Sequence, residues 1–398
     1  MRTSTAPSPT VAAERARIVA GLRYCGVVFV VLRLALTVLG LAGVALLPGL
    51  DPVSAPGWEA HRVTPGWHNA VTAFERFDAL WFLGIAADGY GAGNGTLVFF
   101  PGYPLLIRGL SFLTGGHPLA AALLVSNLCA FGSMVVLYFL SASEWDETVA
   151  RRAVLYLAVF PTSFFLLAPY SEAPFLLLAL LSLRAARRGR WAVAGLAGAG
   201  AAATRNVGVL LVLPLVVEAL HRAREGRRDG VAARLAWSVA PLVGTVAFLG
   251  FAAALAGDWL APVRQQAVWQ RELSFPVFTV MRATGIAFRF VGNYPGGYHL
   301  VDWLVVVPAL AAAAWVALRG RLLYAVYTWA MLLAPLSFIF PSRPFMSLPR
   351  FLLPIFPILW APAVWARRRP GVHTAVVAIS AAGLGALTVL FVAWYFVF

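Results

Sequence analysis

Apolar stretches long enough to cross a membrane recur along the whole length of this 398-residue chain. A transmembrane helix needs roughly 20 predominantly apolar residues, because the hydrocarbon core is about 30 Å thick. Charged residues make up only 12% of the chain, too few to cover the surface of a soluble domain. We therefore expect an all-α polytopic membrane protein. Its eleven candidate spans have centres near Val31, Val125, Val159, Leu178, Gly198, Val212, Val246, Val306, Leu332, Ile358 and Leu384.

Three of the apolar runs are too short to cross a membrane comfortably alone. They cover residues 174–184, 191–203 and 207–220. Irregular backbone at membrane depth is tolerated only where it is buried in protein or lines a cavity. These runs therefore predict short or broken helices around an internal cavity.

Arginine supplies all of the side-chain positive charge, because the chain contains no lysine. If the N-terminus is cytoplasmic and the spans alternate, 20 of the 31 arginines fall on the cytoplasmic side and 10 on the outer side. Short basic loops mark the cytoplasm, so we expect a multi-pass protein of the plasma membrane with a cytoplasmic N-terminus. The net charge of +15 then reflects topology rather than nucleic-acid binding, for which no motif is present.

The chain divides into a tail and one large domain. Residues 1–23 are predicted to form a disordered cytoplasmic tail, and residues 24–398 a single transmembrane domain. The long loops, residues 48–117 and 257–300, fall on the outer side and are rich in Trp, Tyr, Gly and Pro. Long loops of this kind tend to be functional, so we expect an extracytoplasmic site.

Cys25 and Cys129 lie in separate spans and predict neither a disulfide nor a metal site.

Within the first outer loop, residues 67–87 are predicted to form one helix. Asp78 would share a face of that helix with Val71, Phe74, Trp81 and Ile85. A carboxylate amid aromatic residues is costly without a partner and is often functional. The pattern leaves two readings open, a functional carboxylate or one that caps the helix or pairs with an arginine nearby.

Five short segments in order carry a recognisable pattern. They are Arg76-Phe-Asp78-Ala-Leu-Trp-Phe-Leu-Gly-Ile-Ala-Ala-Asp88-Gly-Tyr90 with Phe99-Phe-Pro-Gly-Tyr103 after it, Phe160-Pro-Thr162 with Tyr170-Ser-Glu172, Thr204-Arg205-Asn-Val-Gly208, Gln266-Ala-Val-Trp269-Gln-Arg271, and Leu348-Pro-Arg350-Phe351. Together they resemble the PIG-V family of mannosyltransferases. Phe77 stands where that family commonly has tryptophan.

The resemblance implies a GT-C glycosyltransferase fold. The use of arginine without lysine and the high alanine content favour a bacterial member of the family. Such an enzyme takes a sugar from polyprenyl phosphate and passes it, with inversion, to an extracytoplasmic lipid or glycan acceptor. It implies mannose as the sugar, although the sequence does not distinguish mannose from another lipid-linked sugar such as arabinose or galactose. No metal or other cofactor is expected.

An inverting transfer requires a base for the acceptor hydroxyl and cations for the leaving phosphate. Asp78 is the predicted base, because it falls on the family motif. Arg76, Arg205 and Arg350 are the predicted phosphate-binding residues, since a guanidinium donates two hydrogen bonds to phosphate at once. Arg205 and Arg350 are also placed where an arginine could simply extend toward lipid head groups.

Four further residues are predicted to bind substrate: Asp88, Glu172, Gln266 and Trp269. Glu172 either binds a sugar hydroxyl or pairs with Arg205 across two short helices. Asp88 is a second carboxylate of the motif or a cap of the turn that follows it. Gln266 and Trp269 either form a platform for the sugar or belong to the aromatic belt at the membrane surface.

Two functions from other classes stay open. A transporter or lipid flippase would also have discontinuous helices, but it would show repeated halves and ionisable residues near the midplane. We find no internal repeat, and the polar residues gather in the outer loops. A non-catalytic scaffold is the other alternative, and the presence of Asp78 argues against it.

Overall fold

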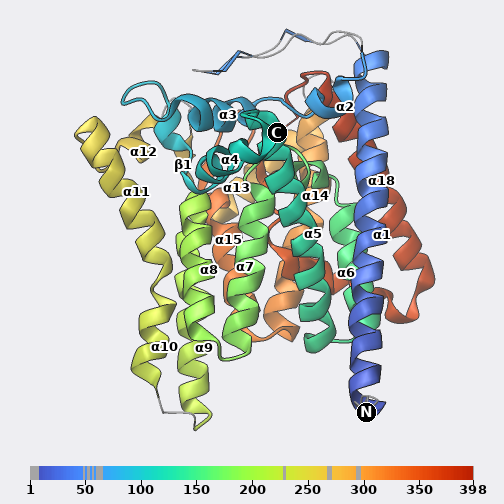
Figure 1. The fold of residues 1–398 in the computed structure, drawn as a ribbon. Helices are drawn as coiled ribbons and strands as arrows, with labels where there is room; N and C mark the ends of the chain where they lie inside the picture. The colour runs from blue at the N-terminus through green and yellow to red at the C-terminus, as the bar shows by residue number, and fades with distance from the viewer. Residues whose placement is uncertain are drawn as a thin grey trace, which may run out of the picture.

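The computed structural model describes residues 9–47, 50–51, 54–55, 58–59, 66–226, 230–266, 271–292 and 297–397. These residues form a helical bundle with two short strands at one end (Figure 1). Six helical segments in the described part are long and apolar enough to cross a membrane, so the chain is a multi-pass membrane protein. They are α1 (Pro9–Leu46), α5 (Pro118–Glu144), η4 (Asn206–Leu211) with α9 (Val212–Arg224), α10 (Val231–Ser238) with α11 (Pro241–Ala256), α14 (Gly297–Arg319) and α18 (Pro370–Val392).

Shorter helices complete the bundle. They are α6 (Glu147–Ala158), α7 (Glu172–Arg187), α8 (Trp191–Thr204), α15 (Leu322–Ser337) and α17 (Trp360–Trp365). The predicted count of eleven spans is not confirmed, because two of them are interrupted. Helix α6 ends just before Val159, with Pro161 close behind, and around Ile358 the chain forms only the short η6 (Phe356–Leu359). Proline lacks the backbone N–H that a helix interior requires, which explains both interruptions.

The N-terminal segment differs from the prediction of a disordered tail. Helix α1 already begins at Pro9 and continues without a break to Leu46. Proline is favoured at the first position of a helix, and the alanines and arginines that follow are good helix formers. In Figure 1 this helix runs along the bundle from the N-terminus toward the opposite end.

The described part of residues 48–117, predicted above to be the first outer loop, packs across the end of the bundle that lies opposite the N-terminus (Figure 1). Its elements are α2 (Asn69–Thr72), α3 (Asp78–Asp88), η1 (Thr96–Val98), α4 (Gly102–Ser111) and η2 (Phe112–Thr114). The prediction of one helix over residues 67–87 is wrong, because Phe77 has a φ of 52° and interrupts it. Val71 is 46% exposed whereas Phe74 is buried, so the predicted stripe does not form one buried face.

The second outer loop is tied to the end of α15 by a small antiparallel sheet. The loop contains α12 (Ala261–Arg264), β1 (Glu272–Leu273) and α13 (Pro276–Arg289). Strand β1 pairs with β2 (Phe338–Ile339), and Glu272 lies opposite Ile339. The chain then forms α16 (Leu348–Phe351) and later η7 (Ala366–Arg368). Segments far apart in sequence thus meet above the bundle.

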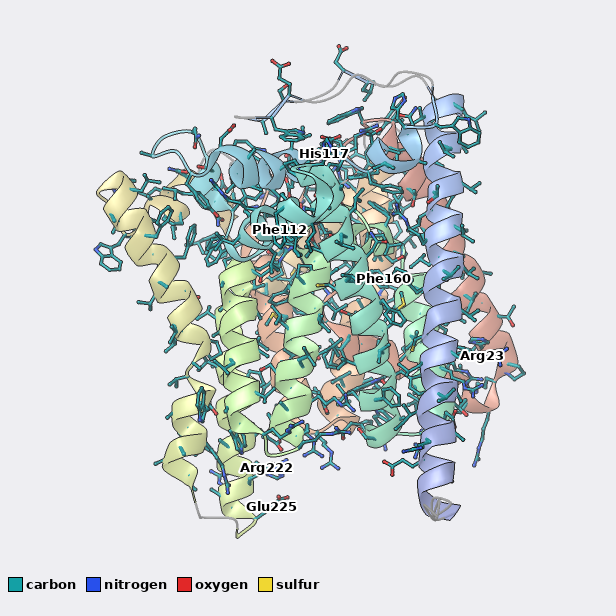
Figure 2. All side chains as sticks on the ribbon, in the orientation of Figure 1. Arg23, Phe112, His117, Phe160, Arg222 and Glu225 are labelled. Carbon is teal, nitrogen blue, oxygen red and sulfur yellow. The ribbon has the colours of Figure 1, made fainter. Side chains whose placement is uncertain are left out.

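The other end of the bundle is fastened by ion pairs. Glu144 at the end of α5 accepts hydrogen bonds from Nε of Arg187 (2.9 Å) and Nε of Arg321 (2.8 Å). Glu218 in α9 accepts from Arg187 (3.1 Å) and Arg222 (2.8 Å). Figure 2 shows Arg222 and Glu225 at the end that holds the N-terminus, and Phe112 and His117 toward the opposite end. Four helices therefore meet in one charged network far from the outer loops.

Candidate active site

A cavity of about 460 Å³ opens beneath α3, at the end of the bundle covered by the outer loops. Its walls come from the start of α3, the turn before α7, the turn after α8, the end of α15, α16 and the C-terminal residues that follow α18. This is the arrangement that the short apolar runs predicted, because the break after α8 lines the cavity. Among the described residues, four charged side chains line it: Asp78, Arg205, Arg271 and Arg350.

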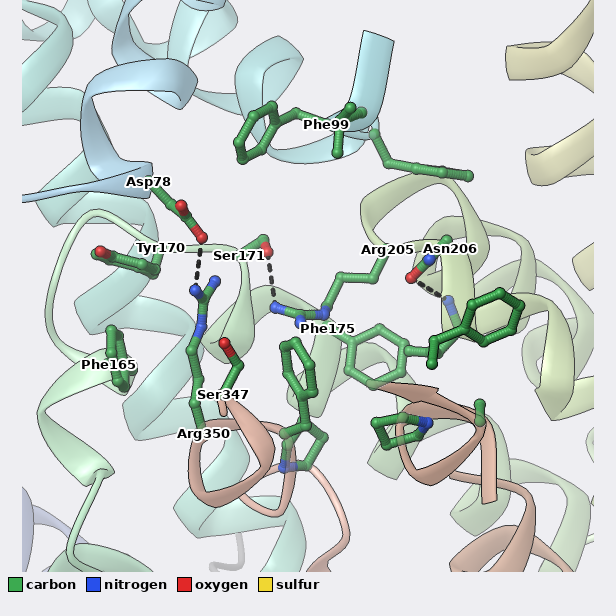
Figure 3. Close-up of a pocket in the computed structure, with 18 of the residues that line it drawn as sticks. Asp78, Phe99, Phe165, Tyr170, Ser171, Phe175, Arg205, Asn206, Ser347 and Arg350 are labelled. Carbon is green, nitrogen blue, oxygen red and sulfur yellow. Dashed lines mark hydrogen bonds and ion pairs between the residues drawn. The ribbon is translucent and has the colours of Figure 1, made fainter. Parts of the chain in front are cut away.

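Asp78 lies at the edge of this cavity as the first residue of α3. The non-helical Phe77 before it turns the chain, so the carboxylate sits at the N-terminus of a helix, where the helix dipole stabilises negative charge. Its Oδ2 accepts a hydrogen bond from Nη1 of Arg350 at 2.5 Å. The side chain remains 27% exposed, which leaves it accessible from the cavity (Figure 3).

Glu172 is the buried centre of the charged cluster. It begins α7 and is fully buried. Its Oε1 accepts a hydrogen bond from Nη1 of Arg205 at 2.6 Å and a second one from Nε of Arg350. The predicted pairing of Glu172 with Arg205 is thus present, whereas a sugar hydroxyl has no access to the carboxylate. The charges form a chain in the order Asp78, Arg350, Glu172, Arg205.

Arg350 is held in place by residues in and beside the five segments that carry the family resemblance. Ser347 has a φ of 66° and starts the turn into α16. Thr162 donates from Oγ1 to the carbonyl of Pro349 at 3.0 Å. The guanidinium of Arg350 lies over the ring of Tyr170, 4.6 Å from its centroid. The turn and the ring together fix the direction of the arginine (Figure 3).

Arg205 reaches the cavity because α8 ends at Thr204 and the next residue is extended. Its Nη1 also donates to Oγ of Ser171 at 3.1 Å. The chain then turns back through η4, and a Cβ on Gly208 would lie 2.5 Å from the backbone of Ala201. Only glycine fits this close approach, which explains the glycine in the Thr204–Gly208 segment.

Arg76 is not brought to the cavity. Its guanidinium is buried and donates to the carbonyl oxygens of Val392 (2.9 Å), Thr72 (3.0 Å) and Glu75 (2.9 Å). It also lies over the ring of Trp394, 4.9 Å from the centroid. Burial lowers the pKa of Arg76 to about 10, although the charge of Glu75 partly offsets this. Arg76 therefore connects the first outer loop to the C-terminal segment rather than facing a ligand.

The remaining predicted residues differ in position. Gln266 lines the cavity. Asp88 is exposed at the far end of α3 and is not among the lining residues. Trp269 lies outside the described residues.

Arg271 lines the cavity and was not predicted as a site residue. Its Nη1 donates to the carbonyl of Phe338 at 3.3 Å, and its guanidinium lies over the ring of Phe340, 5.1 Å from the centroid. Burial lowers its pKa to about 10, and the nearby charge of Asp78 limits the drop. The only sequence signal was its place beside Gln266 and Trp269, because the pairing of β1 with β2 that positions it has no pattern of its own.

Fold and site together define a multi-pass helical membrane protein with a charged cavity at one end of the bundle. Residues 42–235 match the model of the family described as mannosyltransferase (PIG-V), which confirms the resemblance. The match covers just under half of the chain and shows similarity to the PIG-V mannosyltransferases, and the protein is a glycosyltransferase. The matched stretch contains Asp78, Glu172 and Arg205, whereas Arg271 and Arg350 lie beyond it.

Two similar solved structures are crystal structures of ArnT from Cupriavidus metallidurans. The one bound to undecaprenyl phosphate is 16% identical with a TM-score of 0.49, and the one in the apo state is 15% identical with a TM-score of 0.44. Each comparison covers 93% of this chain and 76% of the ArnT chain. No individual curated protein matches the chain.

Proposed function

We propose that this glycosyltransferase moves a sugar from a polyprenyl-phosphate donor to a lipid or glycan acceptor, with Asp78 as the base. The observation that carries the proposal is the position of Asp78, which is partly exposed at the edge of a cavity and held by one strong ion pair. The family points to mannose and to the GT-C fold class. The arginine distribution favours the outer face of the plasma membrane.

The chemistry is a single displacement at the anomeric carbon. The acceptor hydroxyl attacks that carbon and gives its proton to Asp78, while the bond from the carbon to the phosphate oxygen breaks. Attack from the face opposite the phosphate inverts the configuration. Arg350 fixes Oδ2 of Asp78, which leaves Oδ1 to accept the proton. A positioned base of this kind contributes about 10²–10⁴-fold to the rate.

The apolar part of the cavity wall favours a lipid-linked donor. Residues of η4, of the end of α15 and of β2 contribute aliphatic and aromatic side chains: Val207, Val209, Leu210, Met331, Ala334, Pro335 and Phe338. A polyprenyl chain is entirely apolar, and contact with such a wall stabilises it because the contact removes its surface from water. A soluble nucleotide sugar has no apolar chain that this wall could stabilise.

The charged residues divide into two roles. Arg350 and Glu172 position Asp78, since they form one buried hydrogen-bonded chain with it. Arg205 lines the cavity and has one nitrogen engaged by Glu172 and Ser171, so its other N–H groups are placed to contact the donor. Gln266 is placed to contact a sugar hydroxyl. Arg76 and Asp88 have no part in the proposed site.

The test is transfer by the purified protein in liposomes. The donor is radiolabelled polyprenyl-phosphate mannose, and the acceptor is a crude lipid extract, with and without a chelator. Wild type is expected to transfer the label, and Asp78→Asn to reduce kcat by about 10²–10⁴-fold. Asp88→Asn is the matched control, because that carboxylate is also in α3 but outside the cavity, and it is expected to keep wild-type activity. The chelator tests the expectation that no metal is required.

Two outcomes would contradict the proposal. Equal activity of Asp78→Asn and wild type would remove Asp78 from the role of base. Wild type that transfers no lipid-linked sugar but moves the labelled lipid across the bilayer would instead indicate a flippase.

A further inference from the structure

Three guanidinium groups surround one aromatic ring in the cavity. The guanidinium carbons of Arg205, Arg271 and Arg350 lie 5.4, 5.7 and 6.0 Å from the ring centroid of Phe351. The face of an aromatic ring attracts a cation, but it does not neutralise charge. Three like charges so close together in a buried site require anions nearby.

Two of these three cations already have carboxylate partners. Glu172 pairs with both Arg205 and Arg350, and Asp78 pairs with Arg350. Within the described part of the chain, no carboxylate forms an ion pair with Arg271, which donates only to the carbonyl of Phe338. The cluster of two carboxylates and three guanidiniums therefore carries one uncompensated positive charge, and that charge is at Arg271.

Arg271 is partly buried and keeps this charge at neutral pH. Its pKa of about 10 is still well above 7. A charge without a carboxylate partner in this partly desolvated cavity is costly, and an anion that enters the cavity removes part of that cost. The guanidinium also has Nε and Nη2 left for the planar, two-pronged contact with a phosphate.

We propose that Arg271 binds the phosphate of the donor and stabilises it as the leaving group, an assignment that rests on the proposed transferase function. A phosphodiester between a sugar and a lipid carries one negative charge, which matches the single excess positive charge of the cluster. A diphosphate-linked sugar brings a second negative charge that the cluster does not balance. The site thus fits a monophosphate-linked donor, with the sugar between Arg271 and Asp78, since inversion requires base and leaving group on opposite faces.

The test separates binding of the phosphate from transfer of the sugar. Binding of a short-chain polyprenyl phosphate without sugar, and of the uncharged polyprenol, is measured for wild type, Arg271→Gln, Arg271→Lys and Asp78→Asn. Arg282→Gln is the matched control, because this arginine belongs to the same outer loop but is exposed and lies outside the cavity. Transfer is measured in parallel, with donors linked through one phosphate or two.

We expect Arg271→Gln to weaken binding of polyprenyl phosphate by about tenfold or more, with binding of polyprenol unchanged. Arg271→Lys is expected to restore part of the affinity, since it keeps the charge without the fork. Asp78→Asn is expected to keep the affinity and lose transfer, and Arg282→Gln to keep both. Wild type is expected to prefer the monophosphate donor by about tenfold or more.

The failures are distinguishable. If wild type transfers sugar and Arg271→Gln binds polyprenyl phosphate as wild type does, the assignment of Arg271 is wrong and the proposed function stands. If binding depends on Arg271 but wild type transfers no lipid-linked sugar, the phosphate site stands and the proposed function is wrong. A wild type that neither binds nor transfers contradicts both.

Discussion

At the scale of single residues, Glu172 determines whether the charged cluster is stable. It is fully buried and is the shared partner of Arg205 and Arg350. Replacement by glutamine keeps the volume of the side chain but removes its negative charge. Two largely buried guanidinium groups then lose the carboxylate that they share. Breaking a buried ion pair by removing one partner costs about 3–5 kcal/mol. We therefore expect Glu172→Gln to unfold in detergent at a clearly lower midpoint temperature than wild type.

Glu225→Gln is the matched control for this prediction. Glu225 is 55% exposed and, in the described part of the chain, pairs with His221 at the other end of the bundle. An exposed ion pair contributes about 0–1 kcal/mol, so its loss is expected to change the midpoint little. Equal midpoints for Glu172→Gln and wild type would show that the buried cluster contributes no net stability.

Single residues also show what a sequence can and cannot predict about a site. The pairing of Glu172 with Arg205 was one of two alternatives that the sequence offered, because both residues lie at the ends of short helices on the same side. The direction of a side chain could not, and Arg76, two residues before Asp78, points to backbone carbonyls instead of the cavity. Arg271 was missed because its position depends on the pairing of β1 with the distant β2.

At the scale of elements, the close packing of α8 against α11 positions the turn that carries Arg205. A Cβ on Gly244 in α11 would collide with the carbonyl of Ala199 and lie 2.8 Å from the backbone N of Ala203. Both are backbone atoms that move only with the helix. Gly244→Ala is therefore expected to push the helices apart, at a cost of about 1–3 kcal/mol, and to lower transfer activity by displacing Arg205.

Gly250→Ala on the same helix is the control for Gly244→Ala. A Cβ there would meet only the ring of Trp259 at 3.7 Å, which is an ordinary contact. Alanine in place of glycine inside a helix stabilises it by about 0.5–1 kcal/mol, so unfolding in detergent should occur at the same or a higher temperature. If both variants behave alike, the packing of α8 on α11 does not limit stability.

Elements were predicted well where apolar length decides them and less well where a local break does. The runs around Val31, Val125 and Leu384 became continuous helices. The break at Phe77 has no sequence signal, because a positive φ is rare for a bulky residue. Its ring lies against Phe391, Trp394 and Phe396, so contacts with the far end of the chain compensate for the strain.

At the scale of the whole molecule, the two ends of the bundle differ in structure. The end with the N-terminus is closed by the network of Glu144 and Glu218, which fastens four helices. The other end is left open enough for a cavity, because short helices stop there and loops cover it. This division suits an enzyme whose substrates enter from one membrane surface.

The orientation of these two ends in the membrane is the last prediction. Because arginine-rich short loops stay in the cytoplasm, the end with Arg222 and the N-terminus should face inward and α3 outward. Single cysteines are introduced at two exposed positions, Asp88→Cys in α3 and Glu225→Cys after α9, in a protein whose Cys25 and Cys129 are replaced by alanine. Intact cells are then treated with a maleimide that does not cross membranes. We expect Asp88→Cys to be labelled in intact cells and Glu225→Cys only after the membrane is opened. The reverse pattern would place the cavity on the cytoplasmic side, where a donor presented at the outer surface could not reach Asp78.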